Sequence, residues 1–141
     1  MRRIWGVGIV LLLLLSPHGV FAQGTGKERG SRKLGNYPNP FNPTTTITFP
    51  LLESDFRNGR PATVTIQILN ALQQLVAIPL AMDNPAGNGP VKDLMYTQPG
   101  AYRAFWDGLD RTGRKVASGI YYAVLVVNGG DPTIHKLVIT K

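Results

Sequence analysis

The chain has 141 residues, a formal net charge of +7 and no cysteine. The lack of cysteine excludes disulfides, thiol catalysis, cysteine-ligated metals and a lipid-modified N-terminal cysteine. The basic surplus suits an anionic surface, but the densest basic cluster lies in the Gly/Ser-containing stretch 27–33, without interleaved aromatic residues, so we expect no nucleic-acid binding.

The first 22 residues have the three parts of a cleavable signal peptide. Arg2 and Arg3 supply the positive region, 4–15 is an uncharged apolar run, and the predicted cut falls between Ala22 and Gln23. The run is shorter than the roughly 20 residues of a membrane span. We therefore predict export to the periplasm, then to the cell surface or the medium, with membrane contact only through this peptide. An uncleaved anchor helix is the alternative.

The remaining 23–141 suffices for one domain and is too short for two. Residues 23–35 are predicted to form a flexible basic linker, and 36–141 the folded domain.

Alternation of apolar and polar side chains with a period of two predicts strands in this domain and no helix of useful length. The predicted strands are 44–51, 63–68, 75–80, 100–106, 120–127 and 134–140. Turn residues separate these short segments, which is typical of an all-β, immunoglobulin-like antiparallel sandwich of about seven strands.

The segment 37–43, Tyr-Pro-Asn-Pro-Phe-Asn-Pro, is predicted to form a rigid entry into the first strand. Its three prolines fix φ and disfavour helix in the residues before them. A proline-rich ligand for a partner domain is the weaker alternative, since it requires an exposed polyproline helix.

The segment 106–121 is dense in Asp and Gly and is predicted to close a long hairpin. Asp107, Asp110 and Asp131 are possible calcium ligands, but they lack the spacing and the terminal Glu of a calcium loop. We therefore predict no metal site.

Four segments in this order, 36–45, 64–70, 106–121 and 136–141, closely resemble the type A C-terminal sorting domain of the type IX secretion system. That family is similar to the immunoglobulin-like domain of the flagellar hook-capping protein FlgD. The resemblance covers about 105 residues. Its motif residues are Asn36, Pro38, Asn39, Pro40, Phe41, Asn42, Pro43, Trp106, Asp107, Gly108, Gly113, Ser118, Gly119 and Tyr121.

The resemblance implies an export route and its partners. Family members cross the inner membrane, fold in the periplasm and are recognised by outer-membrane translocon proteins, after which a sortase-like peptidase commonly removes the domain. A predicted signal peptide weighs against a hook-capping role. Recognition is expected at the terminal strand, through Lys136, Leu137, Val138, Ile139, Thr140 and Lys141, which could add to a partner's sheet. Such a domain usually follows a long cargo, whereas only 23–35 precede it here.

The connection 81–98 is longer than the family's usual turn, and loops of this length are usually functional or disordered. Alternation places Tyr121, Ala123 and Leu125 inward with Tyr102, Ala104 and Trp106, and turns a second apolar set outward. The reverse assignment of the two faces is the alternative, because both rows are apolar. That possible partner face consists of Phe105, Tyr122, Val124 and Val126. We expect Val91, Leu94 and Met95 of the loop to cover it, with a protein partner as the alternative cover.

We predict no enzyme activity and no cofactor. After signal removal His135 is the sole histidine, and turn formation accounts for Asp107 and Asp110. The favoured function is therefore type IX sorting with almost no cargo. The alternative is an immunoglobulin-like structural or adhesive module that binds a protein partner in the periplasm or at the cell surface.

Overall fold

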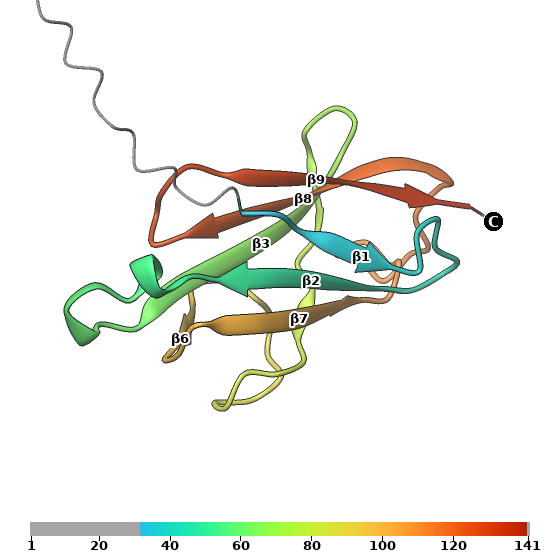
Figure 1. The fold of residues 1–141 in the computed structure, drawn as a ribbon. Coiled ribbons are helices and arrows are strands. Elements are labelled where there is room, and N and C mark those ends of the chain that lie inside the picture. The colour runs from blue at the N-terminus through green and yellow to red at the C-terminus, as the bar shows by residue number, and fades with distance from the viewer. Residues whose placement is uncertain (1–31, 141) are drawn as a thin grey trace, which may run out of the picture.

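The structure of the protein, a computed structural model, describes residues 32–140; the predicted signal peptide, most of the predicted linker and Lys141 lie outside this range. The described chain forms two antiparallel sheets packed face to face (Figure 1). The prediction of an all-β sandwich is confirmed. The helical elements described are two short 3-10 turns, Glu53–Asp55 and Arg57–Gly59. Within 32–140, no helix has the length and hydropathy needed to cross a bilayer.

The strands divide between a four-stranded and a five-stranded sheet. The four-stranded sheet holds, in spatial order, β1 (Gly35–Tyr37), β2 (Thr45–Leu51), β7 (Gly100–Trp106) and β5 (Leu80–Ala81). The five-stranded sheet holds β4 (Leu75–Ala77), β3 (Ala62–Asn70), β8 (Gly119–Val127) and β9 (Thr133–Ile139), with β6 (Leu94–Tyr96) paired to the other end of β3.

The core lies between the two sheets and follows the period-two pattern of the strands. Along β8 the alternate residues Tyr121, Ala123 and Leu125 are buried, as predicted. They face buried residues of the opposite sheet, among them Ala104 and Trp106. Burial of one face of each sheet provides the main stabilisation of the sandwich.

Two expectations about connectivity are wrong. The segment 75–80 is not one strand, because β4 pairs in the five-stranded sheet while β5 pairs with β7 in the other. Likewise, 106–121 does not close a hairpin, because β7 and β8 belong to different sheets. Both segments carry the chain from one layer to the other.

The long connection 81–98 completes an edge of the five-stranded sheet. Val91 is fully buried, and its carbonyl accepts a hydrogen bond from the Ile66 N–H at 2.9 Å. On either side of that bond, β6 and β4 pair with the two ends of β3. This connection therefore satisfies backbone groups of β3 that would otherwise be unpaired.

The fold begins upstream of the predicted boundary at Asn36. Leu34 is buried in the core, and Arg32 forms a bidentate ion pair with Asp55 at 2.7 and 2.9 Å. Arg32 also donates to the Pro50 carbonyl at 2.8 Å. These contacts fix the direction in which the chain enters β1.

Candidate functional site

The terminal strand β9 divides the predicted recognition residues into two sets. Leu137 and Ile139 are buried in the core and cannot contact a partner while the domain is folded. Lys136 and Val138 alternate with them and point away from the core. The accessible side chains of the predicted recognition segment are therefore those of its outward row, and Lys141 lies outside the described residues.

β9 is an edge strand, but the second half of its edge is already paired. The Phe41 N–H donates to the Val138 carbonyl at 2.9 Å, and the Thr140 N–H donates to the Phe41 carbonyl at 3.0 Å. These bonds form a short parallel bridge between Phe41 and Ile139. The expected addition of 136–141 to a partner's sheet is therefore blocked at this part of the strand in the folded domain.

The side chain of Phe41 continues this contact into the core. Its ring lies 5.3 Å from that of Trp106 in a tilted arrangement, and Trp106 meets Tyr121 edge-on at 5.6 Å. The Tyr121 hydroxyl donates to the Ala117 carbonyl at 2.8 Å, which satisfies the polar end of this ring. Three aromatic motif residues distant in sequence thus form one cluster.

Gly108 brings the same two segments together at the backbone level. A Cβ placed on Gly108 would lie 2.2 Å from the Pro43 carbonyl oxygen, and Gly108 has a φ of +76°. Both the close approach and the left-handed backbone require glycine. The turn at Asp107 and Gly108, called the Asp-Gly turn below, is therefore packed against the segment 37–43, called the Asn-Pro segment.

Asn36, on β1, forms hydrogen bonds that link β1 to β9, which runs alongside it (Figure 1). Its amide nitrogen donates to the Pro38 carbonyl and to Thr45 Oγ1, both at 3.1 Å. Thr45 Oγ1, which is buried, donates in turn to the Pro38 carbonyl at 3.0 Å. The imidazole Nε2 of His135 lies 2.8 Å from the amide oxygen of Asn36 and donates to it. Burial lowers the pKa of His135 below the ordinary histidine value.

The carboxylates of the 106–121 connection shape its turns. Asp107 accepts from the Leu109 N–H at 2.9 Å. Asp110 accepts from the hydroxyl and N–H of Thr112 and from the Arg114 N–H, and the Thr112 hydroxyl is the first cause of its lowered pKa. Gly113, with a φ of +82°, completes the second turn. Within 32–140, no group of three or more metal-ligating side chains is found.

The other motif residues lie on the surface and contribute mainly through backbone geometry. The exposed members are Pro38, Asn39, Pro40, Asn42, Pro43, Ser118 and Gly119.

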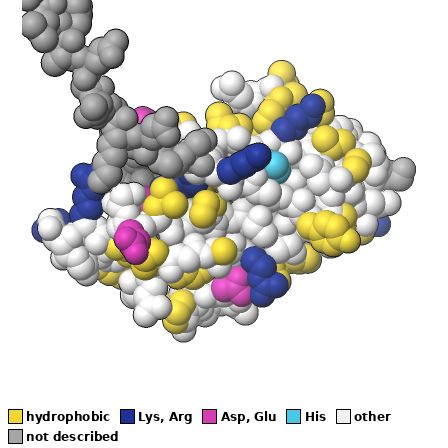
Figure 2. Space-filling view, viewed as in Figure 1, with side chains coloured by type: hydrophobic (Ala, Val, Ile, Leu, Met, Phe, Trp, Pro, Cys, Tyr) yellow, Lys and Arg dark blue, Asp and Glu magenta, His cyan; other side chains and the backbone are white. Residues whose placement is uncertain are grey.

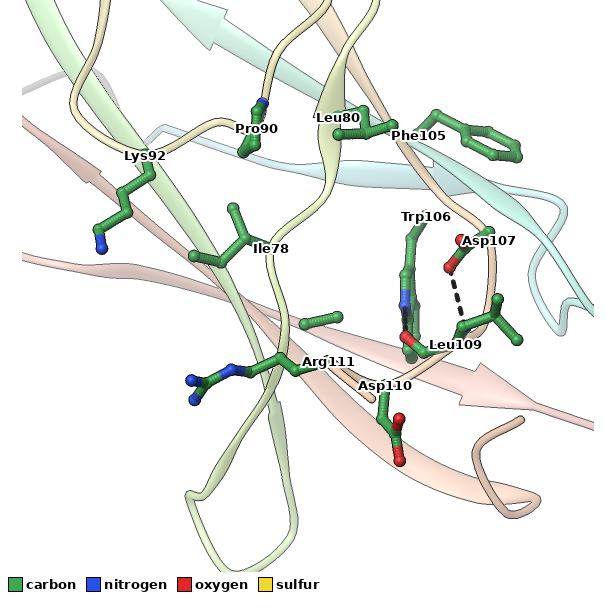
Figure 3. Close-up of a pocket in the computed structure, with 11 residues that line it drawn as sticks. Ile78, Leu80, Pro90, Lys92, Phe105, Trp106, Asp107, Leu109, Asp110 and Arg111 are labelled. Atoms are coloured by element: carbon green, nitrogen blue, oxygen red, sulfur yellow. Dashed lines mark hydrogen bonds between the residues drawn. The ribbon is translucent and has the colours of Figure 1, made fainter. Parts of the chain in front are cut away.

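A hollow of about 470 Å³ opens beside this connection, next to Phe105 (Figure 3). Its apolar lining includes Ile78 and Leu80, and Figure 3 shows Lys92 and Arg111 directed to one side with Asp107 and Asp110 on the other. The Trp106 indole N–H donates to the Leu109 carbonyl at 3.0 Å at its floor. No nucleophile and base are paired among these lining residues, so the hollow offers an apolar depression with charged margins.

The four residues of the predicted partner face do not form one surface. Phe105 lies on β7, whereas Tyr122, Val124 and Val126 lie on β8 of the other sheet, so their outward sides point away from each other. All four side chains are half-buried. A period-two pattern identifies an outward side chain but does not identify the sheet to which it belongs.

The predicted cover for this face is also wrong. Val91 lies in the core and Leu94 faces the interior opposite Val64. Met95, opposite Thr63 of β3, lies at the margin of the outer face of the five-stranded sheet and is 60% exposed. The loop is used to complete the edge of β3, and it leaves the outer face of the five-stranded sheet open.

Sequence reasoning missed Arg32, Leu34 and Thr45. A single basic residue in a Gly/Ser-containing stretch gives no sign of its partner Asp55, which is distant in sequence. The apolar Leu34 just before the Asn-Pro segment was the signal that could have extended the domain.

On the face seen in Figure 2, basic side chains are scattered and form no continuous patch.

No model of a known protein family matches the chain, and no curated protein matches it. Among solved structures, dimeric latent PorU from Porphyromonas gingivalis is similar, with 23% sequence identity and a TM-score of 0.49. The match covers 77% of this chain and 9% of the PorU chain. The chain therefore spans only a small part of the PorU chain to which it is similar.

Proposed function

We propose that the chain is a non-catalytic exported β-sandwich that acts as a C-terminal sorting domain of type IX secretion. Its partners in this role are outer-membrane translocon proteins, and a sortase-like peptidase is a further candidate partner. Export through the inner membrane by the predicted signal peptide is the first step of this route.

One observation carries the proposal. The residues on which the family resemblance rests meet in space: Phe41 packs on Trp106, Gly108 packs on Pro43, and the backbone of Phe41 is bonded to β9. The Asn-Pro segment, the Asp-Gly turn and the terminal strand therefore form one structural unit. This unit presents the outward row of β9, Lys136 and Val138, in a fixed position.

The non-catalytic part of the proposal is supported by how the candidate groups are used. His135 donates to Asn36, and Asp107 and Asp110 hold turn amides. None of these three side chains forms a hydrogen bond with another of them in the described contacts. Each thus has a structural partner that explains its position.

The test is export of a reporter. A folded fluorescent protein inserted between Gln23 and Gly24 of the full chain is expected to reach the cell surface or the medium in a host with a type IX translocon. In an otherwise identical host without the translocon, it should remain in the periplasm. Equal surface delivery in both hosts would refute the sorting function.

The open outer face of the five-stranded sheet favours the second candidate, a structural or adhesive module. A chain that stays in the periplasm in both hosts, and whose apolar face binds another surface, would support that function instead.

A further inference from the structure

The outer face of the five-stranded sheet is mainly apolar along β8 and β9 and mixed along β3, whose outward row is Thr63, Thr65, Gln67 and Leu69. Val124 lies opposite Ile134 on β9, and Tyr122 lies opposite Leu69 on β3. Ile134 and Ile120 are 63% and 42% exposed, although both are large aliphatic residues. The outward apolar set is Leu69, Leu75, Met95, Ile120, Tyr122, Val124, Val126, Ile134 and Val138. A contiguous apolar surface of this kind usually marks an interaction site.

Two opposite charges lie at opposite margins of this face. Lys136, on β9, is the charged residue among the outward side chains of the strands that form it. Asp93 lies at the far side, beyond β3, where its N–H donates to Thr65 Oγ1 at 2.9 Å and its carboxylate is 3.3 Å from the same hydroxyl. Neither Lys136 nor Asp93 has an ion-pair partner within 32–140.

We propose that this face is the contact surface of a homodimer, in which the same face of a second copy covers it. A two-fold axis in the plane of the contact makes residue i of one copy meet residue j of the other and the reverse. An axis that bisects the line from Lys136 to Asp93 therefore pairs Lys136 of each copy with Asp93 of the other. The apolar outward row of β8 then covers that of the second copy, and the outward row of β9 in each copy meets the mixed outward row of β3 in the other.

The arrangement of charges favours a second copy over other occupants. An anionic lipid surface would repel the carboxylate of Asp93 at the margin of the contact. An unrelated protein would have to carry an acid and a base in the reverse order across a matching apolar field. A second copy already has this arrangement, and the contact does not depend on the proposed sorting role.

The deciding experiment is a charge exchange, read by sedimentation equilibrium of the exported chain purified from the periplasm. The native chain is expected to form dimers in the micromolar range. Lys136→Asp and Asp93→Lys, made singly, should each weaken the dimer at least tenfold, because each places two like charges together. The double variant should restore the native dissociation constant to within about threefold, since both ion pairs are then re-formed in reverse.

Matched controls separate this contact from general effects. Lys92→Asp changes the neighbouring charge, which lines the hollow beside Phe105, and should leave the dimer intact. Ile134→Glu should abolish the dimer, whereas Leu80→Glu, at an exposed residue of the other sheet, should not. Circular dichroism verifies the fold of each variant, and Ile134→Thr replaces Ile134→Glu if the latter does not fold.

Three outcomes would overturn the proposal. The first is a native chain that stays monomeric up to several hundred micromolar. The second is a dimer that Lys136→Asp leaves unchanged, or that the charge exchange does not restore. The third is a monomer that instead co-sediments with phosphatidylglycerol vesicles and loses this binding in Ile134→Glu, which would assign the face to lipid.

Discussion

Gly108 lies so close to Pro43 that a Cβ at this position would be 2.2 Å from the proline carbonyl oxygen. The Asp-Gly turn between the sheets and the Asn-Pro segment before β2 are therefore held in direct backbone contact. This contact also brings Trp106 under Phe41, which in turn is bonded to the last strand.

Gly108→Ala should destabilise the domain strongly. The substitution adds a left-handed alanine and forces the Pro43 carbonyl to move, so the free energy of unfolding should fall by about 3 kcal/mol or more. Gly113→Ala is the matched control, since Gly113 has a similar φ of +82° and nothing within 4 Å of its Cβ position. It should cost only about 1 kcal/mol in urea denaturation. Equal losses in the two variants would show that the contact with Pro43 contributes nothing.

Phe41→Ala should loosen the end of β9 as well as the core. Phe41 is fully buried against Trp106, so the loss of stability should be about 3–5 kcal/mol. Phe105→Ala is the control: Phe105 is half-buried on the outer face of the four-stranded sheet, so its loss should lower the free energy of unfolding clearly less. In hydrogen exchange, the Thr140 amide should lose protection in Phe41→Ala, because it donates to the Phe41 carbonyl. Unchanged protection at Thr140 would contradict the proposed link between the Asn-Pro segment and the terminal strand.

His135 should make stability depend on pH just below neutrality. Burial lowers its folded pKa, so the unfolded chain, with a pKa of about 6.5, binds the proton more readily. The free energy of unfolding should therefore be greatest above about pH 6.5 and should fall as the pH drops through the folded pKa. His135→Gln retains a donor for Asn36 but does not titrate. Its urea midpoint should change less than that of the native chain between pH 7.5 and pH 5.5, and an identical decrease in both would exclude His135 as the cause.

The ion pair of Arg32 should stabilise the domain more than that of Arg103. The side chains of Arg32 and Asp55 are only 15% and 11% exposed, so Arg32→Ala leaves a poorly solvated carboxylate and should cost about 1.5–3 kcal/mol. Arg103→Ala breaks an equally short bond to Asp83, but that pair is exposed and should change the denaturation midpoint little. If the two variants were equally stable, the Arg32–Asp55 pair would contribute no more to stability than the exposed Arg103–Asp83 pair.

The fold class follows from alternation and turn residues, but the assignment of strands to sheets does not. The segments 75–80 and 106–121 look continuous in sequence, yet each crosses between layers. β7 and β8 have the same period-two pattern, so the pattern predicts one surface for Phe105 and Tyr122, although the two side chains face opposite directions. Only tertiary pairing distinguishes these cases.

The candidate site was predictable as a set of motif residues, but its contacts were not. The sequence predicts that the segment 37–43 makes a rigid entry into the first strand, and the structure adds that the backbone of Phe41 also closes the edge of β9. The sequence predicts that the connection 81–98 covers an apolar face, because it carries apolar residues of its own. Val91 instead fills the core, and its carbonyl satisfies an N–H of β3 that no pattern in the loop identifies.

The most direct test of the sorting function compares reporter export for three full-length chains in a translocon-bearing host. The native chain should deliver the reporter to the surface, and Arg60→Glu, an exposed charge change away from β9, should do the same. Lys136→Glu combined with Val138→Thr alters the outward row of β9 but keeps Leu137 and Ile139 in the core, so this chain should fold and remain in the periplasm. Equal export of all three chains, or export of the native chain from a host without the translocon, would contradict the account.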